Sequence, residues 1–218
     1  MGATQLNIVF LSGTQGPFLR TKIARKKGAV VQLEVEQKYP IVDHRQLRTQ
    51  LSALGCVFQT PLEQADLYFQ HPARNFKQTD EALRLRRSGA DVCITYKGPK
   101  LDATTKTRRE IELPIAGEHG YERYRELLEV LGFRAVMEVR KTRIPGTIEW
   151  EGIQIEVSLD DVAGLGTFIE LEVLSSPEGL AAAKERLASL AAKLGLEASE
   201  RRGYIDLLES RQADTPAK

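Results

Sequence analysis

Alternation between apolar and charged residues along several short segments is the feature that most constrains how this chain folds. In Leu33–Tyr39 the odd positions are mostly apolar, whereas Glu34, Glu36 and Lys38 occupy the even ones. Successive side chains of a β-strand point to opposite faces, so this period of two predicts a strand with one charged face. That face is either a solvent-exposed surface or the lining of an enclosed space.

The same period recurs in later segments, and it raises the same question for each. One solvated face is ordinary for an antiparallel strand and needs no further explanation when it occurs once. Here, however, the polar faces are almost wholly ionised, and helices with apolar stripes must pack on the opposite faces. Strands of this kind that curl and close would form a barrel with a charged tunnel inside and helices outside. The inward positions are Arg84, Arg86, Thr95, Lys97, Arg108, Glu110, Glu112, Lys141, Arg143, Gln154, Glu156, Ser158, Asp160, Glu170 and Glu172.

The order of the expected elements indicates one α+β domain over residues 31–210, with mostly antiparallel strands. Asp43 is a candidate helix N-cap, and Gly55 and Gly132 follow the ends of helical patterns. Ile144-Pro145-Gly146 predicts a turn that ends a strand. We expect helices over 42–54, 121–131, 177–194 and 203–208, and strands over 31–39, 66–70, 82–87, 91–98, 108–113, 136–143, 147–151, 153–159 and 167–174.

Composition excludes several classes of protein. The 218 residues carry a formal net charge of +1 and no long apolar run, which argues against nucleic-acid and membrane partners. Cys56 and Cys93 form neither a disulfide framework nor a zinc pattern, which fits a reducing compartment such as the cytoplasm. The three histidines have no metal-ligand spacing. The sequence says nothing of oligomeric state.

The two ends of the chain differ from the middle. Residues 1–30 contain no acidic residue, and we expect a basic, disordered extension or an upstream start codon there. A transit peptide is the alternative. We expect residues 211–218 to form a frayed tail.

The inward charges fall into two complementary sets. Carboxylates are hard oxygen ligands that suit Mg²⁺ or Mn²⁺, and they occur on the first and the late strands as Glu34, Glu36, Asp160, Glu170 and Glu172. Arginine and lysine bind phosphate oxygens, and they form the second set as Lys38, Arg84, Arg86, Lys97, Lys141 and Arg143. A ligand that needs both sets is a polyanion carried with its metal ion. A triphosphate fits best, because each phosphate group needs two or three donors.

Several ordered motifs resemble those of the CYTH superfamily, the triphosphate tunnel metalloenzymes. Its ExExK signature is matched by "EVEQK" at 34–38, followed by "DLYF", "TDEALRLR", "TYKGP", "RREIE", "VRKTR" and "SLDDVAGLGTFIELE". The resemblance runs from about residue 31 to 208 and implies an eight-stranded antiparallel closed barrel. It implies catalytic roles for Glu34, Glu36, Lys38 and Glu172. It also implies the metal and phosphate ligand sets just given, and it makes Arg202 and Tyr204 candidates at the tunnel mouth.

The activity remains open between reactions that use the same charges. The segments at 66–86 and 159–172 look most like those of class IV adenylyl cyclases, which would imply conversion of ATP to cyclic AMP and pyrophosphate. The alternative is a triphosphatase that hydrolyses inorganic tripolyphosphate, thiamine triphosphate or a nucleoside triphosphate. A non-catalytic polyphosphate- or nucleotide-binding module is disfavoured, because bare carboxylates would repel such a ligand.

Overall fold

The computed structural model describes residues 33–101 and 105–213. In these residues nine strands form one antiparallel sheet, and five helices lie outside it. The strands are β1 (Leu33–Pro40), β2 (Val57–Phe58), β3 (Leu62–Gln70), β4 (Ala82–Ser88), β5 (Asp91–Lys97), β6 (Arg108–Ile115), β7 (Arg134–Trp150), β8 (Ile153–Val162) and β9 (Gly166–Ser175). The helices are α1 (His44–Ala53), α2 (Phe76–Thr79), α3 (Gly120–Val130), α4 (Leu180–Lys193) and α5 (Tyr204–Ala213).

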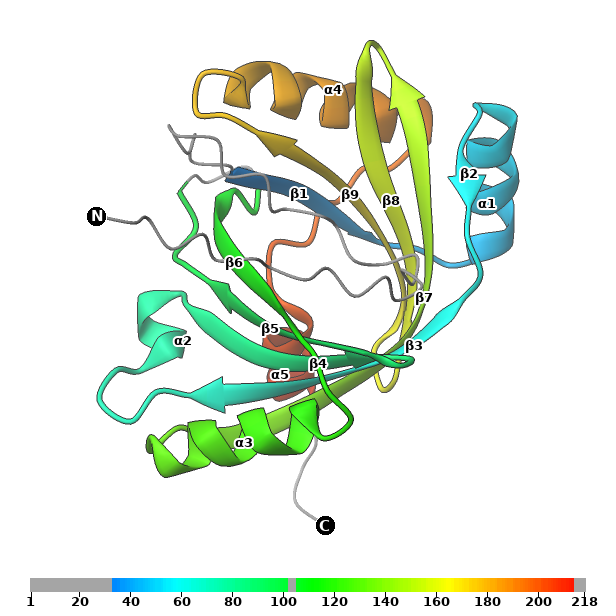
Figure 1. Ribbon diagram of the computed structural model, residues 1–218. Helices are drawn as coiled ribbons and strands as arrows, with labels where there is room; N and C mark the ends of the chain where they lie inside the picture. Colours follow the sequence, from blue (N-terminus) through cyan, green and yellow to red (C-terminus); the bar gives the residue numbers. More distant parts are fainter. Residues whose placement is uncertain (1–32, 102–104, 214–218) are drawn as a thin grey trace, which may run out of the picture.

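Eight of these strands close into a barrel. Their order is β7-β3-β4-β5-β6-β1-β9-β8, and β8 pairs back with β7 to complete the ring. Within the described residues the seam between β6 and β1 is short, because Leu33 and Glu34 alone pair across it, with Arg109 and Arg108. Figure 1 shows the strands curving round into a ring with the helices outside it. The predicted closed antiparallel barrel is therefore confirmed.

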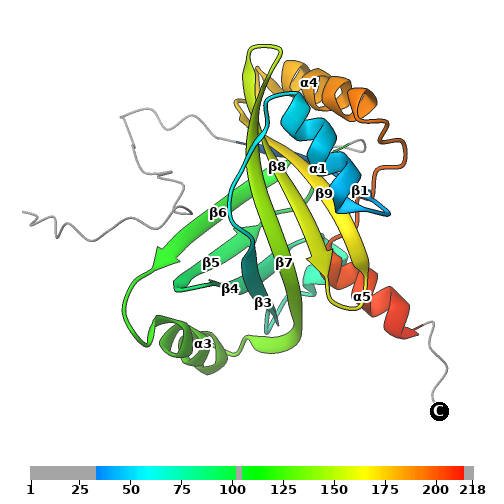
Figure 2. The same cartoon turned by 90° about the vertical axis from the view of Figure 1, so that its right-hand side faces the viewer.

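Helices cover the apolar outer face of the barrel on two sides. On one side, α1 and α4 pack on β1, β8 and β9, where Val35, Leu51, Leu171 and Leu187 are fully buried. On the other side, α3 covers β4, and Leu85 is fully buried there. Figures 1 and 2 show the two helical layers on opposite sides of the barrel. Burial of the odd residues of β1 outside the barrel leaves its even, charged residues facing inward.

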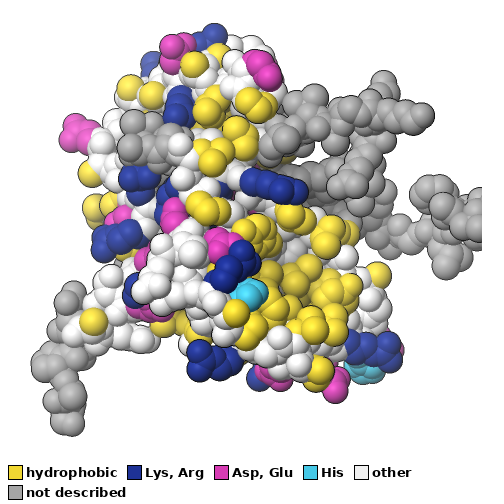
Figure 3. Space-filling view, turned by 90° about the vertical axis from the view of Figure 1, so that its left-hand side faces the viewer, with side chains coloured by type: hydrophobic (Ala, Val, Ile, Leu, Met, Phe, Trp, Pro, Cys, Tyr) yellow, Lys and Arg dark blue, Asp and Glu magenta, His cyan; other side chains and the backbone are white. Residues whose placement is uncertain are grey.

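Among the described residues, helix α3 covers the outer face of β6 only at its end, where Ile115 is buried. Ile111 and Leu113 are exposed on the strand, and so are Leu127 and Leu131 at the neighbouring α3. Figure 3 shows hydrophobic side chains gathered into a broad area on one side of the molecule. No helix of the part that the structure describes is both long and apolar enough to cross a membrane.

The turn predicted at Ile144-Pro145-Gly146 is wrong, because β7 runs through these residues without interruption. Strand β3 pairs with β7 as far as Arg143, and β2 pairs with it from Gly146 onward. Pro145 lies between these two ladders, so its missing N–H breaks neither of them. Its carbonyl oxygen accepts a hydrogen bond from the N–H of Gln59 at 2.8 Å. Figure 2 shows β7 as one long strand.

Most other expected elements occur with shifted ends. Asp43 caps α1 by accepting a hydrogen bond from the N–H of Arg45 at 2.8 Å, and Gly55 follows the helix with φ of +93°. Strand β2 and helix α2 were not expected, and α5 continues to Ala213. Residues 211–213, predicted to begin a frayed tail, instead complete α5, so that part of the prediction is wrong. The extension predicted over 1–30 and the rest of the predicted tail, 214–218, lie outside the described residues.

Candidate active site

The barrel encloses a cavity of about 240 Å³ whose walls are charged. Nearly every inward position predicted from the alternation lines it. The predicted ligands among them are Glu34, Glu36, Lys38, Arg84, Arg86, Lys97, Lys141, Arg143, Glu170 and Glu172, together with Glu110 and Glu112. Asp160 is the one predicted metal ligand that does not line the cavity.

One wall of the cavity carries carboxylates from three adjacent strands. Glu36 of β1 pairs in register with Glu172 of β9, and Glu172 pairs in turn with Glu156 of β8. Glu170 follows on β9, opposite Lys38. Because neighbouring strands lie about 4.8 Å apart, this register brings the carboxylates onto one continuous surface.

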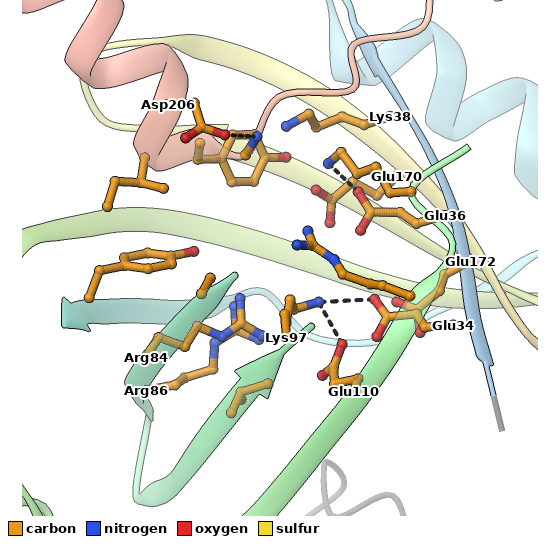
Figure 4. A pocket seen from close by; sticks show the side chains of 18 of the residues that line it. Glu34, Glu36, Lys38, Arg84, Arg86, Lys97, Glu110, Glu170, Glu172 and Asp206 are labelled. Atoms are coloured by element: carbon orange, nitrogen blue, oxygen red, sulfur yellow. Dashed lines mark hydrogen bonds and ion pairs between the residues drawn. The ribbon is translucent and has the colours of Figure 1, made fainter. Parts of the chain in front are cut away.

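Basic side chains already neutralise part of this wall. Lys97 contacts Glu34 at 3.0 Å and Glu110 at 2.6 Å, and these contacts appear in Figure 4. Lys106 contacts Glu36 at 2.6 Å, and Arg143 contacts Glu170 at 2.5 Å.

These contacts bear on whether the wall could hold a metal ion. No three Asp, Glu, His or Cys side chains within 33–101 and 105–213 converge closely enough to do so. The ligand type nevertheless fits Mg²⁺ or Mn²⁺, because the wall is made of carboxylates. An ion could bind Glu34, Glu36, Glu170 and Glu172 once the basic side chains move to another partner.

Asp66 of β3 holds two of the predicted phosphate ligands. Its carboxylate accepts hydrogen bonds from Arg86 Nε at 2.6 Å and Arg86 Nη2 at 2.7 Å, and from Arg84 Nη1 at 3.3 Å. Burial alone would raise the pKa of Asp66, but the guanidinium groups of Arg86 and Arg84 outweigh it and hold that pKa well below its usual range. Asp66 therefore stays charged and fixes both guanidinium groups before any ligand binds.

Asp160 does the same for the other cationic pair. It is fully buried, and it accepts hydrogen bonds from Arg143 Nε at 2.6 Å, Lys141 Nζ at 2.8 Å and the Tyr204 hydroxyl at 2.9 Å. Burial, with the neighbouring Arg143, lowers the pKa of Lys141 to about 8. Both oxygens of Asp160 are thus occupied by groups that line the tunnel.

Lys38 lies against the segment that precedes α5. Its Nζ donates to the carbonyl oxygen of Arg202 at 2.5 Å and lies 4.1 Å from the centre of the Tyr204 ring. Burial and the neighbouring Lys106 lower the pKa of Lys38 to about 7. Tyr204 thus reaches the tunnel wall, whereas the Arg202 side chain is exposed and pairs with Glu200.

Two residues of this site were missed in the sequence. Lys106 shares the even parity of Arg108 and Glu110 but precedes the expected strand. Asp66 belongs to the recognised "DLYF" segment and received no role there. Lys106 could have been found by continuing the alternation before the predicted start of the strand at 108–113. Asp66 could have been found by applying the same alternation along the "DLYF" motif.

Comparisons with known proteins agree with this geometry. A family model described as the CYTH domain matches residues 32–204. A protein of Methanocaldococcus jannaschii, whose name gives adenylate cyclase as a candidate activity, is 44% identical over 140 residues. That match covers 64% of this chain and 76% of the relative.

Two solved structures share the fold. The PH1819 protein of Pyrococcus horikoshii is 39% identical with a TM-score of 0.73, over 82% of this chain and 99% of its own. A Hippeastrum protein described as having a dominant triphosphatase activity is 21% identical with a TM-score of 0.57, over 83% of this chain and 96% of its own. Because the Hippeastrum protein is only 21% identical to this chain, its similarity shows a shared fold alone.

Proposed function

The chain belongs to the CYTH family, and from this premise we propose that it is a divalent-metal-dependent enzyme acting on a triphosphate held in the tunnel. More specifically, we propose that it converts ATP to cyclic AMP and pyrophosphate. One observation carries the proposal. A wall of carboxylates from β1, β8 and β9 shares one cavity inside the closed barrel with arginines and lysines from β4, β5 and β7.

The cations are prepared for phosphate before it arrives. The buried carboxylates Asp66 and Asp160 hold Arg84, Arg86, Lys141 and Arg143 in place. Groups that are fixed in advance lose little freedom on binding, and they stabilise developing charge without reorganising. In this reaction the ribose 3′-hydroxyl loses its proton to water, its oxygen bonds to the α-phosphorus, and the bond from that phosphorus to the oxygen of the β-phosphate breaks. These cations would neutralise the departing pyrophosphate.

The metal site would form on the opposite wall. Glu34, Glu36, Glu170 and Glu172 would hold Mg²⁺ or Mn²⁺, whose chemistry there is to polarise a phosphate group. Lys97 and Lys106, which neutralise Glu34 and Glu36 in this structure, would then contact phosphate oxygens instead. The exchange keeps each buried charge paired, which is the condition for its stability.

The name of the Methanocaldococcus jannaschii relative supports the cyclase reaction over hydrolysis. Product analysis tests it. Purified protein is incubated with ATP and with inorganic tripolyphosphate, with Mg²⁺ or Mn²⁺, and the products are separated by chromatography. We expect cyclic AMP and pyrophosphate from ATP. ADP and phosphate would identify a triphosphatase, and no turnover of either compound would refute both a cyclase and a tripolyphosphatase.

Two variants test the carboxylate wall. Glu36→Gln and Glu172→Gln keep the side-chain volume but remove a charge, so we expect turnover to fall by more than the roughly 10- to 100-fold that loss of an outer-shell partner costs. Glu149→Gln is the matched control, because Glu149 is an exposed strand residue of β7 outside the cavity. Full turnover in both wall variants would remove Glu36 and Glu172 from the metal site.

A further inference from the structure

A second cavity, of about 460 Å³, opens beside the tunnel, between β3, α2, the start of β7 and α5. Tyr68, Phe76, Ala82 and Ile205 line both cavities, so the two lie next to each other. Its volume lies within the roughly 300–1,000 Å³ typical of small-molecule pockets. A ligand whose phosphates occupy the tunnel could therefore extend into this space.

The charges of this second cavity do not suit a further phosphate. Lys77 pairs with Glu209 at 2.7 Å, and Arg74 lies 3.4 Å from Glu81. Among the described residues that line it, nothing corresponds to the guanidinium cluster of the tunnel. Figure 4 shows Asp206, which lines both cavities, on the side of the tunnel away from Glu34 and Glu172. The second cavity thus adjoins the end of the tunnel that carries the predicted phosphate-binding arginines and lysines. Glu34 and Glu172 lie away from that end.

The turn between β3 and α2 forms one wall and is fixed by its own hydrogen bonds. Gln70 Nε2 donates to the carbonyl oxygen of Arg74 at 2.6 Å. His71 Nδ1 accepts from the N–H groups of Ala73 at 3.0 Å and Arg74 at 3.1 Å. Asn75 Oδ1 caps α2. A turn held at these points presents its remaining polar atoms in fixed positions.

Those remaining atoms form a mixed set of donors and acceptors. Since Gln70 uses its amide nitrogen, its Oε1 is left as an acceptor. Since His71 accepts at Nδ1, its neutral ring carries the proton at Nε2, and Asn75 likewise keeps its Nδ2 as a donor. A purine offers both an exocyclic group and ring nitrogens along one edge, so it matches a wall with both kinds of atom.

Aromatic groups beside this wall suit a flat ligand. The His71 ring is held edge-on against Phe133, with centroids 5.1 Å apart, and tilted against Phe76 at 5.6 Å. Tyr68 is half-buried and lines both cavities. Planar side chains held by packing provide surfaces on which an aromatic ring can stack at small entropic cost.

We propose that this cavity receives the purine base of a nucleoside triphosphate whose phosphates lie in the tunnel. The inference rests on the proposed function and adds to it the site that selects the organic part of the substrate. Inorganic tripolyphosphate has no such part and would leave this cavity empty. The two ligands therefore separate the role of the cavity from that of the tunnel.

Val136→Trp tests the proposal, because Val136 lines this cavity but not the tunnel and is 50% exposed. An indole there would obstruct a base, so we expect ATP to bind at least about tenfold more weakly while tripolyphosphate binding changes by less than about twofold. Binding is measured by calorimetry with Mg²⁺. Val57→Trp, at an exposed strand position of β2 outside both cavities, is the matched control and should change neither affinity.

A second variant, Ala73→Trp, places the same obstruction on the exposed turn and should give the same result if Val136→Trp fails to fold. Equal weakening of both ligands, or no change in either, would overturn the base site while leaving the tunnel assignment standing. Failure of the wild-type protein to bind any triphosphate would overturn the proposed function and this inference together. Circular dichroism establishes that each variant is folded.

Discussion

At the scale of single residues, Asp160 has a different environment from the other predicted metal ligands. It shares the alternating pattern of β8, yet it is fully buried behind the cavity wall, and Lys141, Arg143 and Tyr204 occupy its two oxygens. Burial opposes its charge, but Arg143 and Lys141 outweigh burial and keep the pKa of Asp160 below its usual value. These contacts make Asp160 a positioning residue for Lys141 and Arg143, two of the predicted phosphate ligands.

We predict that Asp160→Asn lowers the free energy of unfolding by about 3–5 kcal/mol, because it removes the buried counter-charge of Lys141 and one of the two carboxylate partners of Arg143. Urea unfolding in the presence of EDTA measures this without any contribution from metal. Asp161→Asn is the control, since the neighbouring side chain is exposed and should change stability by no more than about 0.5 kcal/mol. A metal-free Asp160→Asn protein as stable as the wild type would instead favour a role as metal ligand.

Lys141 gives the site a dependence on pH. Its pKa of about 8 means that about half of the molecules carry a neutral Lys141 at pH 8. A bound phosphate favours the charged form, so binding should take up protons there, and affinity should fall as pH rises from 7 to 9. In Lys141→Arg the guanidinium stays charged, so we predict less proton uptake and a flatter pH dependence.

Calorimetry of tripolyphosphate binding at pH 8, in two buffers with different heats of ionisation, measures this proton uptake. Ionisation of the ligand itself cancels when the variant is compared with the wild type at the same pH. Lys193→Arg, at an exposed position of α4, is the control for the substitution. Identical uptake in the wild type and Lys141→Arg would show that Lys141 is already charged before the ligand binds.

The alternating pattern predicts which side chains face the tunnel, but not which of them pair. Lys97 contacts Glu34, and Lys106 contacts Glu36, across 63 and 70 residues of sequence. These pairs depend on how the barrel closes between β1 and β6, which no local pattern encodes. Asp160 illustrates the same limit. It shares the even positions of Glu156 and Ser158 in β8, but whether such a side chain lines the cavity or lies buried behind its wall depends on the residues that pack around it.

At the scale of elements, β7 is where local sequence rules were least informative. Pro145 and Gly146 predict a turn when only their own preferences are considered. The strand continues because β8 pairs along its whole second half and because β2 replaces β3 on the other side. Strand β2 has two residues and α2 has four, too few to show a period.

Gly146 is needed for β2 to approach β7. A Cβ atom there would lie 2.8 Å from the ring of Phe58 and 3.0 Å from Cys56 Sγ. We therefore predict that Gly146→Ala destabilises the protein by about 1–3 kcal/mol through overpacking, as measured by urea unfolding. At Gly98 a Cβ would meet its nearest neighbour at 3.6 Å, an ordinary contact, so Gly98→Ala is the control. An unchanged unfolding midpoint for Gly146→Ala would show that β2 shifts without cost.

At the scale of the whole molecule, the tunnel uses its basic side chains for two purposes. Lys97, Lys106 and Arg143 neutralise carboxylates in this structure, and under the proposed function they would also bind phosphate. A triphosphate alone would draw these cations away and leave carboxylates bare. A metal ion alone would have to displace them from the carboxylates into a space without anions. Each ligand therefore favours the binding of the other, which is the definition of positive coupling.

We predict that Mg²⁺ and tripolyphosphate together raise the melting temperature by more than the sum of their separate effects. At about 100 times the dissociation constant the pair should stabilise the protein by roughly 2.7 kcal/mol, or about 5–10 °C for a chain of this size. Thermal unfolding with each ligand alone, with both, and with tripolyphosphate plus EDTA measures the coupling. Glu36→Gln should weaken it, whereas Glu149→Gln should not. An equal shift by tripolyphosphate with EDTA and with Mg²⁺ would indicate a simple polyanion-binding module, in which the carboxylate wall has no metal to hold.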